Sequence, residues 1–267
     1  MGAGIAHAFL GLGSVVRIVD ADDAATAAAH RRVRDLVQSS ADRGALESPV
    51  EELTARLDST TSYDGLAECD LVVEAVPEDL ELKHRVLDRL GRSARPDAVL
   101  ASNTSSFSIT ALGERVGGRH RFLGLHFFNP VPSSDLVEVV VGRETDPGIV
   151  ELAQTWVEAL GKAAVTVADS PGFATSRLGL ALGLEAIRMV EEGVAPAQDI
   201  DTAMELGYKH PVGPLRLTDI VGLDVRLGVA DYLTEQLGER FRPPQLLRDK
   251  VAAGELGRKT GNGFHDW

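Results

Sequence analysis

Short apolar runs alternate with longer stretches of helical periodicity over the first two thirds of the chain. The runs are continuous rather than alternating with polar residues, as expected of strands covered on both faces of a sheet. They predict six strands, over residues 15–20, 70–75, 98–102, 122–127, 136–141 and 163–167. The intervening residues predict helices, most clearly over 23–41, 81–90 and 147–160. This order is typical of an α/β domain built on a doubly wound, mostly parallel sheet.

The strand pattern ends at Val167, and the residues that follow predict helices only. Gly/Pro-rich turns separate these helices, for example at residues 210–214 (HPVGP). We therefore expect two domains, a sheet domain over residues 1–168 and an all-α domain over residues 169–267. Residues 171–190 and 213–237 of the second domain are rich in Leu, Ala, Ile and Val, more than one layer of helices buries, which favours pairing with another copy.

The charge and cysteine content narrow the range of partners. With 27 Lys and Arg against 40 Asp and Glu, the net charge is −13, which disfavours binding to nucleic acid or to an anionic membrane. Cys69 is the single cysteine, and no stretch approaches the ~20 uninterrupted apolar residues of a membrane span. We expect a soluble, cytoplasmic protein. The seven histidines show no metal-ligand spacing, so metal catalysis is not expected.

The N-terminal residues resemble the second half of a dinucleotide-binding βαβ unit. In that unit a glycine lets a helix pack closely on the sheet, and an acid about 20 residues later binds the adenosine ribose. Gly2 begins a small-residue helical segment, and Asp20 ends the next strand 18 residues later. A carboxylate there favours NAD over NADP. Asp20 has an alternative interpretation, in which it ends the strand by capping the helix that follows.

The first strand and the first two glycines of such a unit are missing from the sequence. Since that strand is normally central and its loop binds the pyrophosphate, we expect the natural reading frame to begin about a dozen residues upstream, with Met1 an internal residue of the glycine loop. The alternative is a truncated, non-catalytic remnant. An upstream in-frame strand with a G-x-G motif would support the first interpretation, and a stop codon immediately upstream would exclude it.

Two neighbouring strands predict an acid–base pair. If residues 122–127 and 136–141 fold back about Pro132, antiparallel pairing places His126 opposite Glu138. Glu138 lies in an apolar run, where an ionised carboxylate is costly without a partner. A carboxylate on one imidazole nitrogen fixes the tautomer and makes the other nitrogen a general base. The spacing therefore favours a His126–Glu138 dyad over a histidine that merely packs in the core.

Six motifs in a fixed order carry a resemblance to a known family. They are GAGIAH at 2–7, EAVPE at 74–78, SNTSS at 102–106, HFFNP at 126–130, PGF at 171–173 and GRKTG at 257–261. The chain resembles the 3-hydroxyacyl-CoA dehydrogenase family, particularly its 3-hydroxybutyryl-CoA branch, over nearly its whole length. The resemblance implies a Rossmann-type NAD domain, a helical domain that forms a homodimer, and reversible oxidation of L-3-hydroxyacyl-CoA in a cleft between the domains.

The resemblance also assigns roles near the reacting atoms. His126 would take the proton of the 3-hydroxyl, and Glu138 would orient it. Ser105 matches the serine that binds the substrate oxygen, although its cluster could instead cap the next helix. Asn129 matches an asparagine near substrate and nicotinamide, with a structural loop residue as the alternative. Ser176 stands where the family often has Asn, and this departure leaves open a hydroxyacyl group on a carrier protein as the substrate.

Further contacts to NAD and coenzyme A follow from the same matches. Glu78 and Lys83 stand where family residues line the NAD site, although such a pair in the first turns of a helix is more often solvated. Lys259 matches a lysine that reaches NAD from the C-terminal tail, with an exposed charge as the alternative. Three arginines of the helix predicted over residues 23–41 are candidates to bind the ribose-phosphate end of coenzyme A, namely Arg31, Arg32 and Arg34. The alternative is that they form only an exposed helix face.

Overall fold

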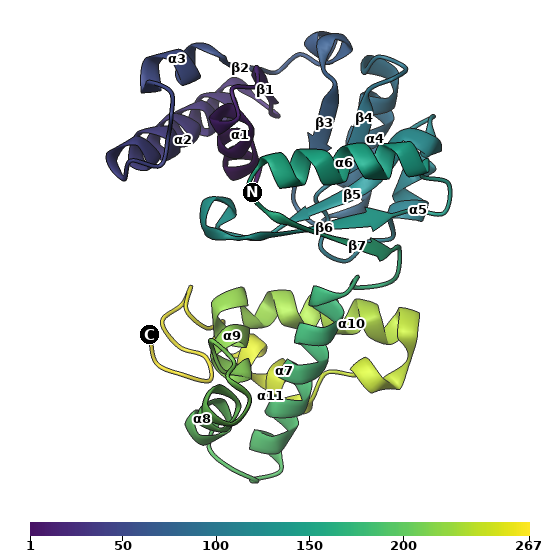
Figure 1. Ribbon diagram of the computed structural model, residues 1–267. Coiled ribbons are helices and arrows are strands. Elements are labelled where there is room, and N and C mark those ends of the chain that lie inside the picture. Colours follow the sequence, from purple (N-terminus) through teal and green to yellow (C-terminus); the bar gives the residue numbers. More distant parts are fainter. The chain divides into compact units, whose positions relative to one another are not determined.

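The computed structural model describes all 267 residues, and the chain divides into two compact units, Met1–Asp169 and Ser170–Trp267 (Figure 1). All strands lie in the first unit, and the second unit is helical. The predicted class, a mostly parallel α/β sheet with a separate all-α domain, is confirmed. None of the helices combines the length and the apolar composition that a membrane crossing requires.

A five-stranded sheet forms the centre of the first unit. Its strands follow chain order and are β3 (Leu71–Glu74), β4 (Val99–Ser102), β5 (Phe122–Phe127), β6 (Leu136–Val141) and β7 (Ala163–Ala168). Neighbouring strands are parallel except β5 and β6, which are antiparallel. The short loop after β5 therefore returns the chain directly beside it, whereas each parallel pair needs a longer crossover.

A second, two-stranded sheet consists of β1 (Val16–Val19) and β2 (Leu57–Thr60), which are parallel. The sequence predicts β1 but neither β2 nor the short helix α3 (Val50–Ala55) before it. Leu57 is the only apolar residue of β2, and Asp58, Ser59 and Thr60 follow it. A polar strand that pairs along one edge lacks the apolar run by which the other strands are recognised.

Several helices of the first unit begin at a capping side chain. Asp22 accepts a hydrogen bond from Ala25 N at the start of α2, and Asp79 accepts one from Leu82 N at the start of α4. The helix α4 continues three residues beyond its predicted end. The bounds are α1 (Gly2–Gly11), α2 (Asp23–Asp42), α4 (Leu80–Ser93), α5 (Ile109–Gly113) and α6 (Pro147–Ala159), with short 3₁₀ turns at Asp64–Glu68, Arg119–Arg121 and Val131–Ser133.

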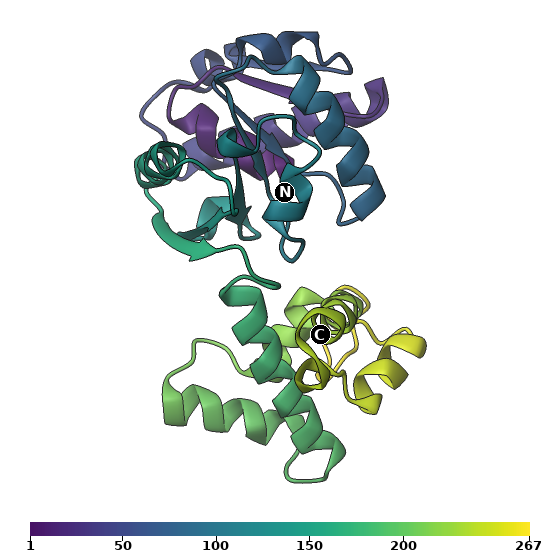
Figure 2. The same ribbon diagram turned by 90° about the vertical axis from the view of Figure 1, so that its right-hand side faces the viewer.

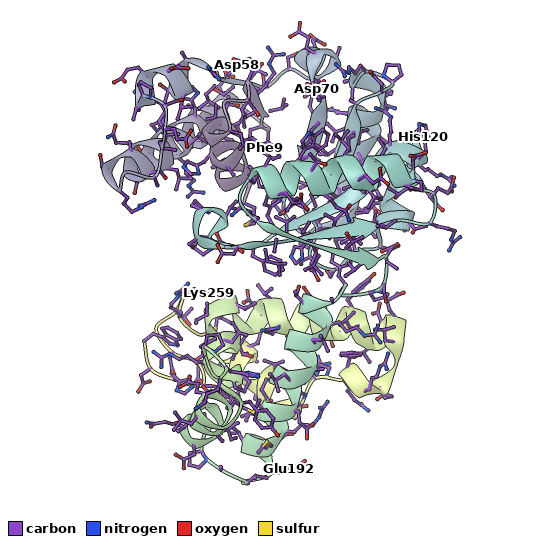
Figure 3. All side chains as sticks on the ribbon, viewed as in Figure 1. Phe9, Asp58, Asp70, His120, Glu192 and Lys259 are labelled. Carbon is purple, nitrogen blue, oxygen red and sulfur yellow. The ribbon has the colours of Figure 1, made fainter.

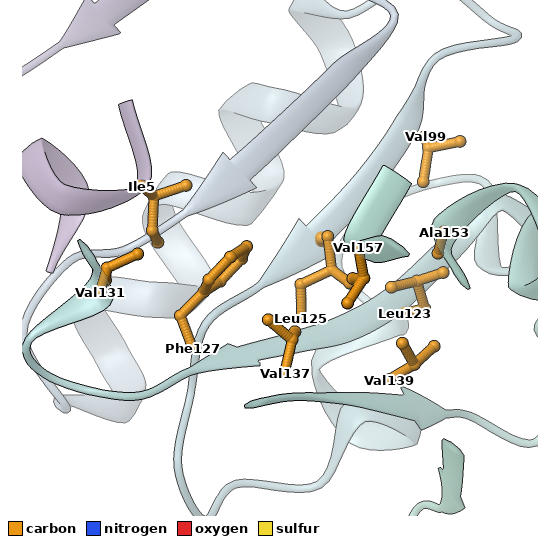
Figure 4. Close-up of a cluster of buried hydrophobic side chains, with 11 residues drawn as sticks. Ile5, Val99, Leu123, Leu125, Phe127, Val131, Val137, Val139, Ala153 and Val157 are labelled. Carbon is orange, nitrogen blue, oxygen red and sulfur yellow. The ribbon is translucent and has the colours of Figure 1, made fainter. Parts of the chain in front are cut away.

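The main core of this unit packs α1 and α6 against the sheet (Figure 4). Phe127 of β5, Val137 of β6 and Val157 of α6 are each at most 2% exposed. Burying a side chain of this size stabilises the fold by about 1.5–3 kcal/mol. At Gly4 a Cβ atom would lie 3.0 Å from Val131 Cβ, so a side chain there would push α1 away from the segment that follows β5.

The second unit is a bundle of five helices, which Figure 2 shows from the side. Leu184, Leu215 and Leu233 come from three of them and are at most 1% exposed. The helices are α7 (Thr175–Glu191), α8 (Ala197–Tyr208), α9 (Pro214–Val221), α10 (Leu223–Leu237) and α11 (Gln245–Ala252), with a 3₁₀ turn at Glu239–Phe241.

The C-terminal tail, residues 257–267, is bound to this bundle by two buried carboxylates. Asp219 accepts hydrogen bonds from Phe264 N at 2.8 Å, His265 N at 2.9 Å and Trp267 Nε1 at 3.0 Å. The His265 Nε2 atom is 2.8 Å from Asp201 Oδ2. A Cβ atom on Gly263 would lie 2.2 Å from Asp219 Oδ1, so only glycine lets the tail come this close.

Candidate active site

Polar side chains gather at the carboxyl ends of β3, β4 and β5. The register pairs Glu74 with Ser102 and Ser102 with Gly124, so these strand ends are level with one another. His126 is two residues beyond Gly124 on β5. In open α/β sheets, ligands bind outside the carboxyl ends of the strands. This edge is therefore the candidate active site.

His126 and Glu138 form a buried pair, as the strand spacing predicts. They are Cα partners in the antiparallel β5–β6 pairing, and His126 Nδ1 lies 2.7 Å from Glu138 Oε2. The two residues are 6% and 0% exposed. The Phe128 ring packs against the imidazole with centroids 4.4 Å apart. With Nδ1 facing the carboxylate, the imidazole is held in one orientation, the arrangement that general-base catalysis needs.

Lys83 and Glu74 form a second buried pair, and the interpretation of Lys83 as a solvated charge is wrong. Lys83 is 1% exposed, and its Nζ atom lies 2.9 Å from Glu74 Oε1 and 3.2 Å from Glu78 Oε2. Glu74 also accepts hydrogen bonds from Ser102 Oγ at 2.6 Å and Val76 N at 2.8 Å. The network ties α4 to the ends of β3 and β4.

Glu78 collects donors from the loop after β4. Its Oε1 atom accepts hydrogen bonds from Thr104 Oγ1 at 2.6 Å, Ser105 N at 3.0 Å, Ser105 Oγ at 3.3 Å and Ser106 Oγ at 3.2 Å. Burial alone would raise the pKa of Glu78, but Lys83 and the hydrogen bonds from Thr104 Oγ1 and Ser105 N outweigh burial and lower that pKa. The alternative in which this cluster caps the next helix is not seen, because Ser108 caps α5.

Three residues of this edge were not singled out from the sequence, namely Glu74, Ser102 and Asn103. Asn103 joins the two buried pairs, because its Oδ1 atom accepts a hydrogen bond from Phe127 N at 2.9 Å and its N–H donates to Glu74 O at 2.8 Å. Glu74 carries the signal that identified Glu138, an acid inside an apolar strand. Ser102 and Asn103 belong to the SNTSS motif at 102–106, and they lie at the end of β4 and directly after it, which are the two signs that could have identified them.

Of the residues predicted to bind a dinucleotide through the N-terminal βαβ unit, Gly2 lies beside this edge. A Cβ atom on Gly2 would be 3.8 Å from Ala75 Cβ, which places the start of α1 beside the end of β3. No side chain caps α1. Asp20 follows β1, is exposed and accepts a hydrogen bond from Ala21 N at 2.8 Å. Because Asp22 caps α2, the alternative role of Asp20 as that cap is excluded.

Asn129 and the three arginines of α2 lie on the surface of the first unit. Asn129 is exposed directly after β5 and precedes Pro130 through a cis peptide bond. Arg31, Arg32 and Arg34 are exposed on α2. Arg31 and Arg34, but not Arg32, line a cavity of about 240 Å³ together with Asp35, Gln38 and Val50.

The two remaining candidates belong to the second unit. Ser176 lies half-buried in the first turn of α7. Lys259, labelled in Figure 3, lies in the tail, and its Nζ atom is 2.5 Å from each carboxylate oxygen of Asp224. Burial alone would raise the pKa of Asp224, but the hydrogen bond and charge of Lys259, together with backbone hydrogen bonds, outweigh burial and lower that pKa. Lys259 is thus a paired charge rather than a free one.

Sequence comparison matches each unit to a described domain. Residues 1–170 match the 3-hydroxyacyl-CoA dehydrogenase NAD binding domain, and residues 172–267 match the 3-hydroxyacyl-CoA dehydrogenase C-terminal domain.

Individual relatives cover the whole chain. The 3-hydroxybutyryl-CoA dehydrogenase of Bradyrhizobium diazoefficiens is 39% identical over an alignment of 270 positions that covers 100% of this chain and 92% of that protein. The mitochondrial hydroxyacyl-coenzyme A dehydrogenase of Rattus norvegicus is 38% identical over an alignment of 276 positions that covers 100% of this chain and 88% of that protein. The crystal structure of (S)-3-hydroxybutyryl-CoA dehydrogenase from Ralstonia eutropha has a TM-score of 0.95 at 39% identity, covering 100% of this chain and 95% of that one.

Proposed function

Because the chain belongs to the 3-hydroxyacyl-CoA dehydrogenase family and is an NAD-dependent dehydrogenase, we propose that it oxidises a short L-3-hydroxyacyl-CoA reversibly to the 3-ketoacyl-CoA. The relatives named for 3-hydroxybutyryl-CoA support that substrate. The observation that carries the proposal is the buried His126–Glu138 hydrogen bond at the carboxyl end of the sheet.

The groups around the sheet edge fit NAD. The first N–H groups of α1 have no side-chain cap and can donate to a pyrophosphate. Asp20 presents an exposed carboxylate after β1, suited to ribose hydroxyls and unfavourable for a 2′-phosphate. Glu78 and Lys83 border the carboxyl ends of β3 and β4. We also assign Lys259 of the second unit, which pairs with Asp224, to NAD. When bound, NAD accepts the hydride that leaves C3 of the substrate.

His126 acts as the general base in the oxidative direction. Its Nε2 atom takes the proton of the 3-hydroxyl while the C3–H bond breaks and the carbonyl forms. Glu138 is the acceptor for Nδ1–H, so it fixes the tautomer and stabilises the imidazolium that results. In the reductive direction the imidazolium returns the proton to the alkoxide oxygen.

We assign polar side chains of each unit to the substrate. We assign Ser105, whose hydroxyl already belongs to the Glu78 cluster, and Asn129 to the reacting oxygen. Ser176 takes the place of the amide common in the family. On α2, Arg31 and Arg34 beside their cavity, with Arg32 on the same helix, supply positive charge for the ribose-phosphate end of coenzyme A.

The test is the formation of NADH from NAD and L-3-hydroxybutyryl-CoA. We expect His126→Gln to lower kcat by about 10²–10⁴-fold, the usual contribution of general acid–base catalysis. The control is His120→Gln, since His120 is exposed. A folded His126→Gln variant that retains the activity of the parent chain would exclude this mechanism.

A hydroxyacyl group on a carrier protein is the second candidate substrate. The observation in its favour is Ser176, which donates one hydrogen bond from a shorter reach than the family's amide. Turnover of the same acyl group on coenzyme A and on a carrier protein, compared with one sample, decides between them. A kcat/KM that is higher for the carrier-bound form would replace the first proposal with the second.

We also propose that the enzyme is a homodimer through its helical unit. The support is apolar surface on that unit, where Leu178, Leu206 and Tyr208 are 71%, 68% and 77% exposed. Sedimentation equilibrium tests the dimer, and a monomer at micromolar concentration would exclude it.

A lone cysteine without a disulfide partner suits a reducing compartment such as the cytoplasm.

A further inference from the structure

The end of β5 that carries His126 extends beyond the neighbouring strand β4. The parallel β4–β5 pairing stops at Ser102 and Gly124, whereas the antiparallel pairing with β6 continues to Phe127. The last three residues of β5 therefore have a strand partner on the β6 side only. A backbone N–H group that faces the other side needs a different acceptor, because a buried N–H group without one is costly.

The side chain of Asn103 supplies that acceptor. Its Oδ1 atom accepts a hydrogen bond from Phe127 N at 2.9 Å, and Phe127 is 2% exposed. Asn103 is the first residue after β4, so its amide oxygen stands in for the backbone carbonyl that a longer β4 would provide. The bond is made at the residue directly after His126, so it fixes the backbone beside the imidazole.

Asn103 is itself fixed on the side of β3. Its N–H donates to Glu74 O at 2.8 Å, and the Glu74 carboxylate binds Lys83 Nζ at 2.9 Å and Ser102 Oγ at 2.6 Å. Glu74, Lys83 and Ser102 are each at most 3% exposed, so water does not compete for these bonds. The buried pair of β3 and α4 therefore anchors the residue that holds the end of β5.

His126 is held from two sides as a result. On the β6 side its Nδ1 atom lies 2.7 Å from Glu138 Oε2, and on the β4 side the Asn103 bond holds the next backbone N–H. The direction of an imidazole depends on the position of its backbone. A displacement of about 1 Å at a catalytic group can lower the rate about 10²-fold, which is why such groups need support from their neighbours.

We propose that Asn103 is a positioning residue for His126, which acts through Phe127 N and keeps the Nδ1 proton of the imidazole directed at Glu138. Without the Asn103 acceptor the end of β5 shifts, and the bond between imidazole and carboxylate weakens. The effect on the imidazole follows from the fold alone. Only the effect on turnover rests on the proposed function.

The first measurement follows the ring nitrogens of His126 by NMR, in protein labelled with isotopic histidine. Their chemical shifts report which nitrogen carries the proton, and the His126 signals are assigned by their absence from His126→Gln. Asn103→Leu removes the acceptor at similar size, Asn103→Ser is too short to reach Phe127 N, and Asn103→Asp keeps an acceptor oxygen. At about pH 8, where a free imidazole is neutral, we expect a single Nδ1–H tautomer in the parent and in Asn103→Asp, and a mixture of tautomers in the other two.

The second measurement is the rate of L-3-hydroxybutyryl-CoA oxidation by NAD in the same variants. We expect kcat to fall about 10- to 100-fold in Asn103→Leu and Asn103→Ser, with little change in the KM for NAD, and to recover at least in part in Asn103→Asp. Gln198→Leu is the control, because it removes an exposed amide from α8 in the other unit, and it should match the parent in both measurements.

The proposal is overturned if folded Asn103→Leu and Asn103→Ser keep the single tautomer of the parent, since Asn103 would then only close the sheet edge. It is also overturned if the parent itself shows a mixture of tautomers, if the tautomer changes while kcat of an active enzyme does not, or if Asn103→Asp restores neither property. If the parent chain does not oxidise this substrate, the proposed function fails separately, and the tautomer measurement alone decides whether Asn103 positions His126.

Discussion

Replacing Glu138 by glutamine keeps the shape of the side chain and removes the charge hydrogen-bonded to His126 Nδ1 at 2.7 Å. Glu138 is 0% exposed, so water cannot substitute for the lost charge. In the proposed reaction the imidazole becomes positive as it takes the substrate proton. The carboxylate interaction therefore strengthens toward the transition state, which is the condition for an effect on kcat.

The expected decrease in kcat follows from the type of hydrogen bond that Glu138 makes with His126. A hydrogen bond to a charged group contributes about 1.5–3 kcal/mol, and each ~1.36 kcal/mol in the barrier is tenfold in rate. We therefore expect kcat for L-3-hydroxybutyryl-CoA oxidation to fall about 10- to 150-fold in Glu138→Gln. The KM for NAD should change little, since this pair is assigned to the substrate hydroxyl.

The assay is the initial rate of NADH formation over a matrix of both substrates. Glu151→Gln is the matched control, because Glu151 lies exposed on α6 of the same unit, and circular dichroism checks the fold of both variants. A folded Glu138→Gln enzyme with kcat within a factor of about three of the parent would refute the reasoning, because a charge-assisted bond would then contribute less than expected.

Three more predictions concern stability and cofactor choice. Burial, Arg43 and Lys162 lower the pKa of His7 below its usual 6.5. Below pH 6.5 the unfolded chain therefore takes up a proton that the folded chain does not, so the free energy of unfolding falls on acidification. Between about pH 7 and pH 5 the Tm of His7→Gln should fall less than the Tm of the parent protein. An equal fall in both proteins would contradict this. Lys83→Met leaves the Glu74 carboxylate buried without its cation and should lower the free energy of unfolding, measured in urea, by about 3 kcal/mol. The Glu74→Gln/Lys83→Met double variant should recover part of this lost stability. No recovery would argue against the ion pair. Asp20→Ala should raise the KM for NAD about tenfold, through the loss of roughly 1.5 kcal/mol of hydrogen bonding. It should also lower the ratio of kcat/KM for NAD to kcat/KM for NADP. An unchanged ratio would show that Asp20 does not bind the adenosine ribose.

The sequence predicted the elements whose pattern is local. The pairing of His126 with Glu138 could be found because β5 and β6 are consecutive strands joined by a short loop, so their separation alone sets the register. In contrast, β2 pairs with a strand far earlier in the chain, and its residues Asp58, Ser59 and Thr60 give no apolar signal. A buried strand can be predicted from its run of apolar residues. A polar edge strand forms only because it pairs with a partner strand, and its own composition does not identify that partner.

The buried network around Lys83 shows the same limit in the site. Lys83 on α4 meets Glu74 on β3 and Glu78 in the loop between them, while Ser102 arrives from β4. From sequence, a lysine near a helix start is indistinguishable from a solvated one. Its burial follows only when the crossover places α4 against the strand ends, which is a property of the assembled sheet.

The attachment of the tail has a consequence for turnover of the protein in a cell. Asp219 is 1% exposed and receives three of its donors from residues 264–267. A proteolytic cut before Phe264 would remove three donors of the Asp219 carboxylate and would take His265 from Asp201, so the defect would lie in the helical bundle. Such a cut is therefore expected to destabilise the helical unit and to make that unit more susceptible to further proteolysis.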